Sequence, residues 1–346
     1  ANPKNNYEQL AIAKELLLWH ANQYTTFDAS AALPYIKTLA NEQEDPAHIQ
    51  KLAIMEAELL MTLDRPVMAK EILLQAKTLQ KNPDVLLALS NVEEKINNKL
   101  NWINRVFTEY GLETVYLGSR IATSLYDRLA AKQPETVVEN GPKVSVLLPV
   151  YNAANGIETA IDSILDQSWK NIELIVIDDQ STDDTTQIVK SYMEKDKRVQ
   201  LYQTPVNSGP YVARNIGLSR ATGEFVTVND ADDWSHPRKI EYQVNHLLKH
   251  PEVIANTSEH ARLTEDLNFY RRGLFGRYIF PNMSSLLFRT EPVLEKVGYW
   301  DEVRFAGDGE FKRRLLHVFG KENIVDLETG PLSLPRQSTN SLTASS

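Results

Sequence analysis

Between residues 143 and 230, apolar segments of strand length alternate with segments of helix length. KVSVLLPVY (143–151), IELIVIDD (172–179) and EFVTVND (224–230) are almost continuous apolar runs rich in β-branched residues. Such runs are typical of strands buried on both faces, and their alternation with helices predicts a mostly parallel sheet with flanking helices. This pattern fixes the fold class of the second half of the chain as α/β.

The first 130 residues have a different pattern. Segments 7–23, 47–64 and 66–79 carry apolar residues at helical spacing, which predicts a series of amphipathic helices. The pair 47–64 and 66–79 resembles a tetratricopeptide-type (TPR-like) hairpin, and a plain helical bundle explains the same pattern equally well. We expect this all-α part to be a scaffold or a docking surface for a protein partner or a further domain.

A short segment separates these two patterns. Residues 131–142 lack apolar periodicity and contain two prolines and a glycine, so we interpret them as a linker. The predicted domains are a helical domain at 1–130 and an α/β domain at 143–346. Because the chain does not begin with methionine, we expect it to be part of a longer polypeptide, with the second domain truncated at its C-terminus.

Composition excludes several classes of protein. A net charge of −9 over 346 residues argues against nucleic-acid binding. The absence of cysteine excludes disulfides and thiolate metal sites. No apolar stretch approaches the roughly 20 residues that a membrane helix needs. We therefore expect no membrane-spanning segment and a cytoplasmic location, with the inner face of the membrane as a further place of action.

Polar residues follow the predicted strands at the points where the strands end. Tyr151 and Asn152 lie at the end of the first strand, Asp178 and Asp179 close the strand at 172–179, and NDADD (229–233) closes the strand at 224–230. In open parallel sheets, ligands bind beyond the carboxyl ends of the strands. The sequence therefore predicts a ligand site at this edge.

The acidic cluster in this edge needs a positive partner, because like charges so close repel one another. Mg²⁺ and Mn²⁺ prefer hard oxygen ligands and are often held by one or two carboxylates together with substrate phosphates. We predict that Asp230 and Asp232 bind such an ion, which neutralises the charge of a leaving diphosphate. The alternative is a solvated acidic turn before a helix capped by Ser235.

Five segments in order carry a resemblance to a known family. They are VSVLLPVYNAANGIETAIDSILDQ, IELIVIDDQSTDDT, NSGPYVARNIGLSRATGEFVTVNDADDW, VGYWDE and AGDGEFKRRL. Together they resemble the family 2 inverting nucleotide-sugar glycosyltransferases over residues 143–320. The resemblance implies a GT-A fold and metal-dependent transfer of a sugar, most often from a UDP-sugar, to a hydroxyl of a glycan acceptor. It also implies a role in bacterial surface polysaccharide synthesis.

The resemblance further assigns roles to residues. The residues implied to contact the nucleotide are Pro149, Tyr151, Asn152, Asp179, Gly209, Arg214 and Asp230. The implied metal ligands are Asp230 and Asp232. The residues implied to contact the donor or acceptor sugar are Asp233, Trp300, Asp301 and Glu310. Three of these have simpler explanations: Asp179 as a cap of the turn after it, Arg214 as a surface ion pair, and Trp300 as core filling.

Asp308 is the catalytic base that the resemblance implies. An inverting transfer needs one carboxylate to take the proton of the attacking acceptor hydroxyl. We expect Asp308 at a helix N-terminus, facing out of the core, where an acid can also serve only to balance the helix dipole. Family members often have Glu directly before this Asp, whereas this chain has Gly307, and Glu310 is the reserve candidate for the base.

The sequence also allows other interpretations of three arginines and of the class of protein. Arg271, Arg272 and Arg277 are candidates for binding an anionic acceptor or the donor diphosphate, or they belong to a solvated loop. The chain can also be a non-catalytic nucleotide-binding module on a helical adaptor. A nucleotidyltransferase is disfavoured, because PVYNAANGIE (149–158) has no basic, glycine-rich phosphate loop.

Overall fold

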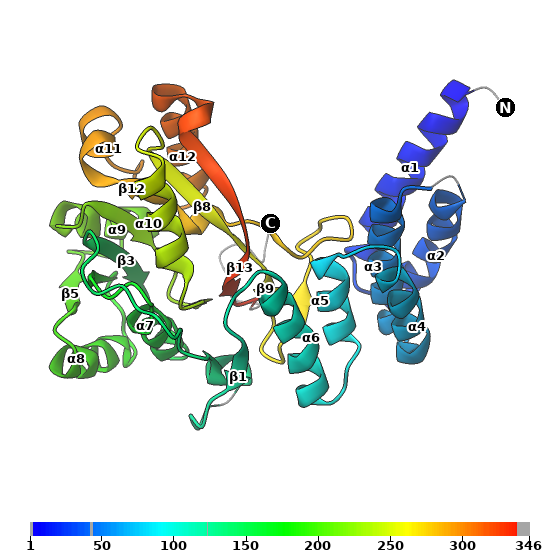
Figure 1. Ribbon diagram of the computed structural model, residues 1–346, viewed down its shortest axis with the longest axis horizontal. Coiled ribbons are helices and arrows are strands. Elements are labelled where there is room, and N and C mark those ends of the chain that lie inside the picture. The colour runs from blue at the N-terminus through cyan, green and yellow to red at the C-terminus, as the bar shows by residue number, and fades with distance from the viewer. Residues whose placement is uncertain (1–2, 42–43, 123, 338–346) are drawn as a thin grey trace. The chain divides into compact units, whose positions relative to one another are not determined.

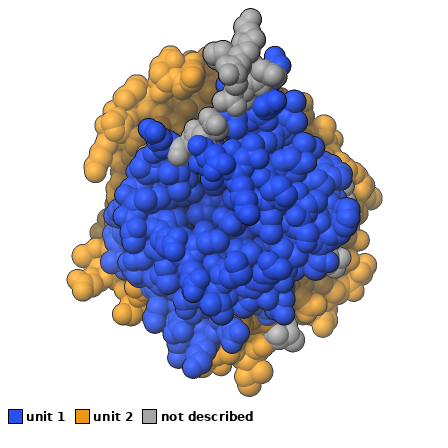
Figure 2. Space-filling model, turned by 90° about the vertical axis from the view of Figure 1, so that its right-hand side faces the viewer, with its two compact units in different colours: residues 1–111, 262–279, 337–346 blue, residues 112–261, 280–336 orange. Residues whose placement is uncertain are grey.

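The structure is a computed structural model that describes residues 3–41, 44–122 and 124–337 (Figure 1). The chain forms two compact units, which are coloured separately in Figure 2. The helical unit contains residues up to 111, residues 262–279 and Gln337. The α/β unit contains residues 112–261 and 280–336.

Six helices build most of the helical unit. They are α1 (Pro3–Ala21), α2 (Thr26–Ala40), α3 (Pro46–Thr62), α4 (Pro66–Lys77), α5 (Pro83–Asn91) and α6 (Ile96–Glu109). Proline opens α3, α4 and α5, where its missing N–H costs little. Successive helices pack in pairs, α1 with α2, α3 with α4 and α5 with α6. The N-terminal helical region is therefore as predicted.

Residues 262–279 complete the helical unit although they lie far away in sequence. They contain the antiparallel strands β9 (Arg262–Leu263) and β10 (Phe269–Tyr270). The Arg271 side chain is fully buried, and its Nε lies 2.6 Å from Oε2 of Glu58 on α3. The hydroxyl of Tyr278 donates to the other oxygen of Glu58 at 2.6 Å. Arg271 is thus an internal ion-pair residue, and the expectation of a solvated or anion-binding arginine does not hold for it.

Removing this buried guanidinium should destabilise the helical unit. We expect Arg271→Met to lower the free energy of unfolding by about 3 kcal/mol, because breaking a buried ion pair leaves Glu58 without its cation. Arg272 is exposed, and Arg272→Met is the matched control, expected to change stability by less than about 0.5 kcal/mol. Urea denaturation measures both, and equal effects of the two substitutions would contradict the role of the buried pair.

The first half of the α/β unit follows the predicted alternation. Its elements are β3 (Val144–Val150), α7 (Ile157–Leu165), β4 (Ile172–Asp178), α8 (Thr185–Lys195), β5 (Val199–Gln203), α9 (Pro210–Arg220) and β6 (Phe225–Val228). Strands β5, β4, β3 and β6 are neighbours in that order, and all three pairs are parallel (Figure 1). This confirms the α/β class.

The second half of the unit continues the same sheet with mixed strand directions. Its elements are β7 (Asp233–Ser235), α10 (Lys239–Lys249), β8 (Ala255–His260), β11 (Phe280–Pro281), β12 (Leu287–Arg289), α11 (Thr290–Lys296), α12 (Gly307–Phe319) and β13 (Ile324–Pro335). Strand β12 pairs antiparallel with β6 and β8, and β13 lies parallel to β8 and antiparallel to β7. Edge strand β11 pairs antiparallel with β8.

Both faces of this sheet are buried. Val146 and Leu148 of β3 belong to a core that includes side chains of α7, α8 and α10, whereas Leu147 belongs to a second core with α9, α11 and α12. Consecutive side chains of a strand point to opposite faces, so a strand covered on both faces must be apolar throughout. Among the described residues, no helix is both long and apolar enough to cross a membrane.

The structure divides the chain earlier than the predicted linker. The N-terminal segment of the helical unit ends at Gly111, and β1 (Val115–Leu117) pairs with β2 (Leu129–Ala131) inside the α/β unit. The segment expected to be a linker, 131–142, is also fixed there, because Trp169 Nε1 donates to the Pro142 carbonyl at 3.0 Å. A Cβ atom on Gly141 would lie 1.9 Å from the Trp169 ring, so the glycine allows this close packing.

Candidate active site

The parallel strands bring the predicted polar residues to one edge of the sheet. Val150 is level with Asp178 across β3 and β4, and Leu147 is level with Val228 across β3 and β6. The loops that follow are joined, since the Asn152 side-chain oxygen accepts from the Thr182 N–H at 2.8 Å. Tyr151 is 54% exposed on this edge, while Pro149 is buried within β3.

Asp179 anchors the loop that precedes α9. Its Oδ1 accepts from the Thr204 hydroxyl at 2.7 Å and from the Ser208 N–H at 2.9 Å. Its Oδ2 accepts from the N–H of Gly209 at 2.7 Å, and the residue is only 4% exposed. Gly209 has φ of +93°, a conformation that favours glycine. The turn over Ser181 is capped by the neighbouring Asp178 instead.

Arg214 on α9 joins two of the predicted acids. It is 3% exposed, and its Nη2 donates to Oδ1 of Asp230 at 2.8 Å. Its Nη1 donates to Oδ1 of Asp308, which lies in the first turn of α12. The structure therefore brings together, from three separate elements, the predicted base, the first residue of the acidic cluster and the predicted nucleotide-binding arginine.

The pKa values of Asp308 and Arg214 are both shifted from their ordinary values. Burial raises the pKa of Asp308, and the nearby positive charge of Arg214 opposes that rise. Burial alone would lower the pKa of Arg214, but the charges of Asp308 and Asp230 outweigh it and raise that pKa. Carboxyl groups perturbed by burial and by a specific charge partner are typical of catalytic sites.

Cations of this chain lie beside the acidic turn. Arg214 is one, and the buried Lys239 at the start of α10 is another. Its Nζ lies 3.2 Å from Ser235 Oγ and 3.3 Å from Asn229 Oδ1. Burial lowers the pKa of Lys239 to about 8, and the charges of Asp233 and Asp230 oppose this shift. No pattern in the sequence marked Lys239 as part of the site, although it lies only four residues after Ser235.

The carboxylates suit a metal ion only in part. The side chain of Asp230 is about a third exposed, and Asp232 is exposed, so both can reach a ligand. Within residues 3–41, 44–122 and 124–337, no group of three or more His, Asp or Glu side chains could hold a metal by itself. Two carboxylates are nevertheless the number that Mg²⁺ often takes from protein when substrate phosphates supply further oxygens.

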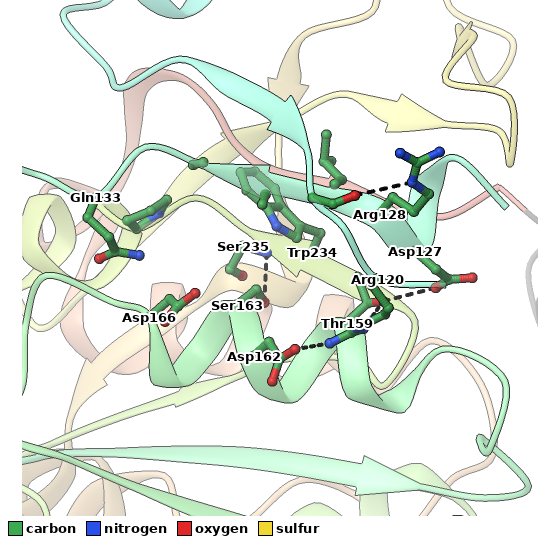
Figure 3. A pocket seen from close by; sticks show the side chains of 15 residues that line it. Arg120, Asp127, Arg128, Gln133, Thr159, Asp162, Ser163, Asp166, Trp234 and Ser235 are labelled. Carbon is green, nitrogen blue, oxygen red and sulfur yellow. Dashed lines mark hydrogen bonds and ion pairs between the residues drawn. The ribbon is translucent and has the colours of Figure 1, made fainter. Parts of the chain in front are cut away.

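Tyr126 binds the backbone of the acidic turn through its hydroxyl group. Its fully buried hydroxyl accepts from the Trp234 N–H at 2.9 Å and lies 3.1 Å from the Asp232 carbonyl oxygen. No sequence signal pointed to this residue, because it lies in a segment assigned to the helical domain. A neighbouring cavity of about 150 Å³ lies between the β1–β2 pair, α7 and β7. Figure 3 shows the side chains that line it. The cavity contains the Arg120–Asp162 ion pair and none of the predicted site residues.

Two predicted sugar contacts have other roles. Trp300 is 3% exposed and stacks on Phe311 with the ring centroids 4.4 Å apart, so it fills the core and the prediction that it lines an acceptor cleft is wrong. Glu310 is paired with Arg314, with Oε2 and Nη2 2.8 Å apart, and hydrogen bonding to Arg314 lowers its pKa. This pairing disfavours Glu310 as a base.

The remaining two predicted sugar contacts, Asp301 and Asp233, differ in how far they are buried. Asp301 is exposed, 3.9 Å from Arg314. Asp233 is buried at the start of β7. Neither residue is among those that Arg214 brings together.

His236, three residues after Asp233, makes stability depend on pH. Burial lowers its pKa to about 4, whereas in the unfolded chain the value is about 6.5. As pH falls below 6.5, the unfolded chain binds a proton that the folded chain does not, so stability is lost. We expect a loss of about 2 kcal/mol between pH 7.5 and pH 5. Urea denaturation at both pH values, with His236→Gln as the control that lacks this proton, measures it. An equal loss in the control would contradict the assignment.

Part of the chain is similar in sequence to known glycosyltransferases. Residues 145–298 match the sequence model of the family described as "Glycosyl transferase family 2". An uncharacterised glycosyltransferase of Haemophilus influenzae is 46% identical over 117 residues, which cover 34% of this chain and 47% of that protein. A Bacillus subtilis protein named as a teichuronic acid biosynthesis glycosyltransferase is 42% identical over 108 residues, which cover 31% of this chain and 43% of that protein.

Solved structures are more distant. Staphylococcus aureus TarS 1–349 in complex with UDP-GlcNAc aligns with 59% of this chain and 61% of that chain, at 22% identity and a TM-score of 0.49. The chain spans less than half of the length of each of the two relatives above.

Proposed function

We propose that the α/β unit, in which residues 145–298 match the model of glycosyl transferase family 2, transfers a sugar from a UDP-sugar to a hydroxyl group of a glycan acceptor, with inversion at the anomeric carbon. The observation that carries the proposal is the double ion pair of Arg214 with Asp230 and Asp308. Asp308 lies beyond the segment that matches the family, and this ion pair connects it to residues inside that segment.

Asp308 is the proposed catalytic base. Its partly buried carboxyl, whose pKa is raised by burial, is suited to accept a proton from an acceptor hydroxyl. The acceptor oxygen then bonds to the anomeric carbon as the bond to the diphosphate breaks on the opposite face. The proton stays on Asp308 and the electron pair leaves with the diphosphate. Glu310 is the weaker candidate for the base, because its hydrogen bonds to Arg314 occupy the carboxylate and lower its pKa, and a carboxylate of lower pKa is a poorer proton acceptor.

The nucleotide is proposed to lie across the carboxyl ends of β3, β4 and β6. Tyr151 is half-exposed and can lie against the base, and Arg214 can turn its fork towards phosphate or carbonyl oxygens. Asp230 and Asp232 would hold Mn²⁺ or Mg²⁺, and such an ion supplies neutralisation of the diphosphate charge. Asp179 is proposed to act on the nucleoside mainly through the Gly209 loop that it anchors.

A role in surface polysaccharide synthesis is also part of the proposal. The name of the Bacillus subtilis relative supports it. The helical unit, with three successive helix pairs, is proposed to be a tetratricopeptide-like docking surface for a protein partner. Phe27 and Val67 are among the apolar side chains exposed on it.

Release of UDP from a panel of UDP-sugars with Mn²⁺ or Mg²⁺ tests the activity. We expect metal-dependent release with one preferred sugar, and a loss of about a hundredfold or more in Asp308→Asn, because the proton acceptor is removed. Asp166→Asn is the matched control, since burial also raises the pKa of Asp166, which lies elsewhere at the end of α7. UDP binding without release for any sugar would instead support the non-catalytic nucleotide-binding module.

The metal assignment is tested by calorimetry of UDP binding. We expect Mn²⁺ to strengthen UDP binding to the parent protein, and Asp230→Asn to reduce that strengthening by at least about tenfold, because even partners outside the ligand shell are worth that much. Asp166→Asn should behave like the parent. Equal UDP affinity with and without metal in the parent would show that the Asp230–Asp232 assignment is wrong.

A further inference from the structure

Tyr211 lies directly against the proposed base. It is the second residue of α9 and is 6% exposed. Its hydroxyl oxygen lies 3.2 Å from Oδ2 of Asp308 and 3.2 Å from the backbone nitrogen of the same residue. A backbone N–H can only donate, so the hydroxyl accepts from it and its own proton is directed to the carboxylate.

The start of α12 is shaped to receive the Tyr211 ring. A Cβ atom on Gly307 would lie 2.7 Å from Cε1 of Tyr211 and 2.8 Å from Cδ1 and Cζ. A side chain at position 307 and the tyrosine ring therefore compete for the same space. The residue before it, Ala306, has φ of +60°, a left-handed conformation in which the chain turns into the helix. The absence of a side chain at 307 is thus matched to the presence of Tyr211.

The two oxygens of the Asp308 carboxylate accept hydrogen bonds from different side chains. Arg214 donates to Oδ1 and Tyr211 to Oδ2 of Asp308. Arg214 is shared, because it also bonds Asp230 and its guanidinium lies 4.9 Å from the centre of the Tyr211 ring. Within the described residues, Asp308 is the only acid that Tyr211 hydrogen-bonds. Tyr211 can therefore hold Asp308 when Arg214 engages a nucleotide.

Building on the proposed function, we propose that Tyr211 is a positioning residue that orients the Asp308 carboxylate and stabilises its ionised form. Burial and the Asp308 charge raise the pKa of Tyr211, so its phenol stays protonated and remains a donor. A hydrogen bond to the charged form of an acid favours ionisation, so loss of the hydroxyl should raise the pKa of Asp308.

The charged and titratable side chains that face Asp308 are Tyr211 and Arg214 from α9 and Asp230 from the turn after β6. Arg214 stays charged throughout the working pH range, because both neighbouring acids raise its pKa. The acid limb of a pH–rate profile is then expected to report Asp308.

The test is the pH–rate profile of UDP release for Tyr211→Phe. Phenylalanine keeps the ring on which Gly307 packs, so the fold is retained. We expect kcat to fall about three- to tenfold, which matches the loss of one hydrogen bond, and the acid limb to move to higher pH. The donor KM and the affinity for UDP should change less than twofold. Gly307→Ala, whose methyl group displaces the ring, should move the acid limb in the same direction.

Tyr202→Phe is the matched control. Tyr202 also lies beneath an arginine, Arg220, but its hydroxyl donates to Gln200 and touches no acid of the site. Its profile should match that of the parent. A Tyr211→Phe profile that superimposes on the parent would overturn the inference and leave the proposed function intact. Loss of UDP affinity in Tyr211→Phe would also overturn it, because the residue would then act on the nucleotide.

Failure of the proposed function would be seen separately, as no UDP release by the parent with any donor. The contact can then be tested without turnover, by carboxyl ¹³C NMR titration with the Asp308 signal identified by its absence in Asp308→Asn. A higher Asp308 pKa in Tyr211→Phe than in the parent would support the inference. An unchanged pKa would contradict it.

Discussion

The candidate site depends on one buried guanidinium. Arg214 is almost completely buried, and a charge in that position is tolerated only if acids are held against it. Asp230 and Asp308 provide the two acids, from the end of β6 and the start of α12. The arginine thereby fixes where α12 begins relative to the sheet edge. Removal of either acid would leave a buried positive charge only half compensated.

The same principle organises the helical unit. Arg271 is fully buried against Glu58, and Tyr278 binds the other oxygen of that carboxylate. Asp84 accepts the backbone N–H groups of Tyr278 and Ile279 at 2.8 and 2.9 Å. A segment that lies inside the family match, 262–279, is thus bound to N-terminal helices that lie outside it. The loop between β8 and β11 consequently takes its shape from the helical unit.

Much of the site was predictable because local sequence decides it. Short continuous apolar runs rich in β-branched residues indicate buried strands, and parallel strands place their carboxyl ends at one edge, so the residues after β3, β4 and β6 gather there. Asp308 was predictable as a first-turn acid of a helix. Tyr211 could have been found as well, because it stands three residues before Arg214 and therefore lies on the same face of α9.

Other features were decided by contacts between residues distant in sequence. Trp300 and Arg271 are buried because Phe311 and Glu58 meet them in three dimensions, and neither partner is close in sequence. The positive charges beside the acidic turn, Arg214 and Lys239, were likewise not evident from the turn alone. The sequence by itself determined which segments are strands and helices and which chemistry lies at the strand ends. Only the tertiary structure decided which charge faces which acid, because ion pairs and ring packing form across elements whose spacing no local pattern records.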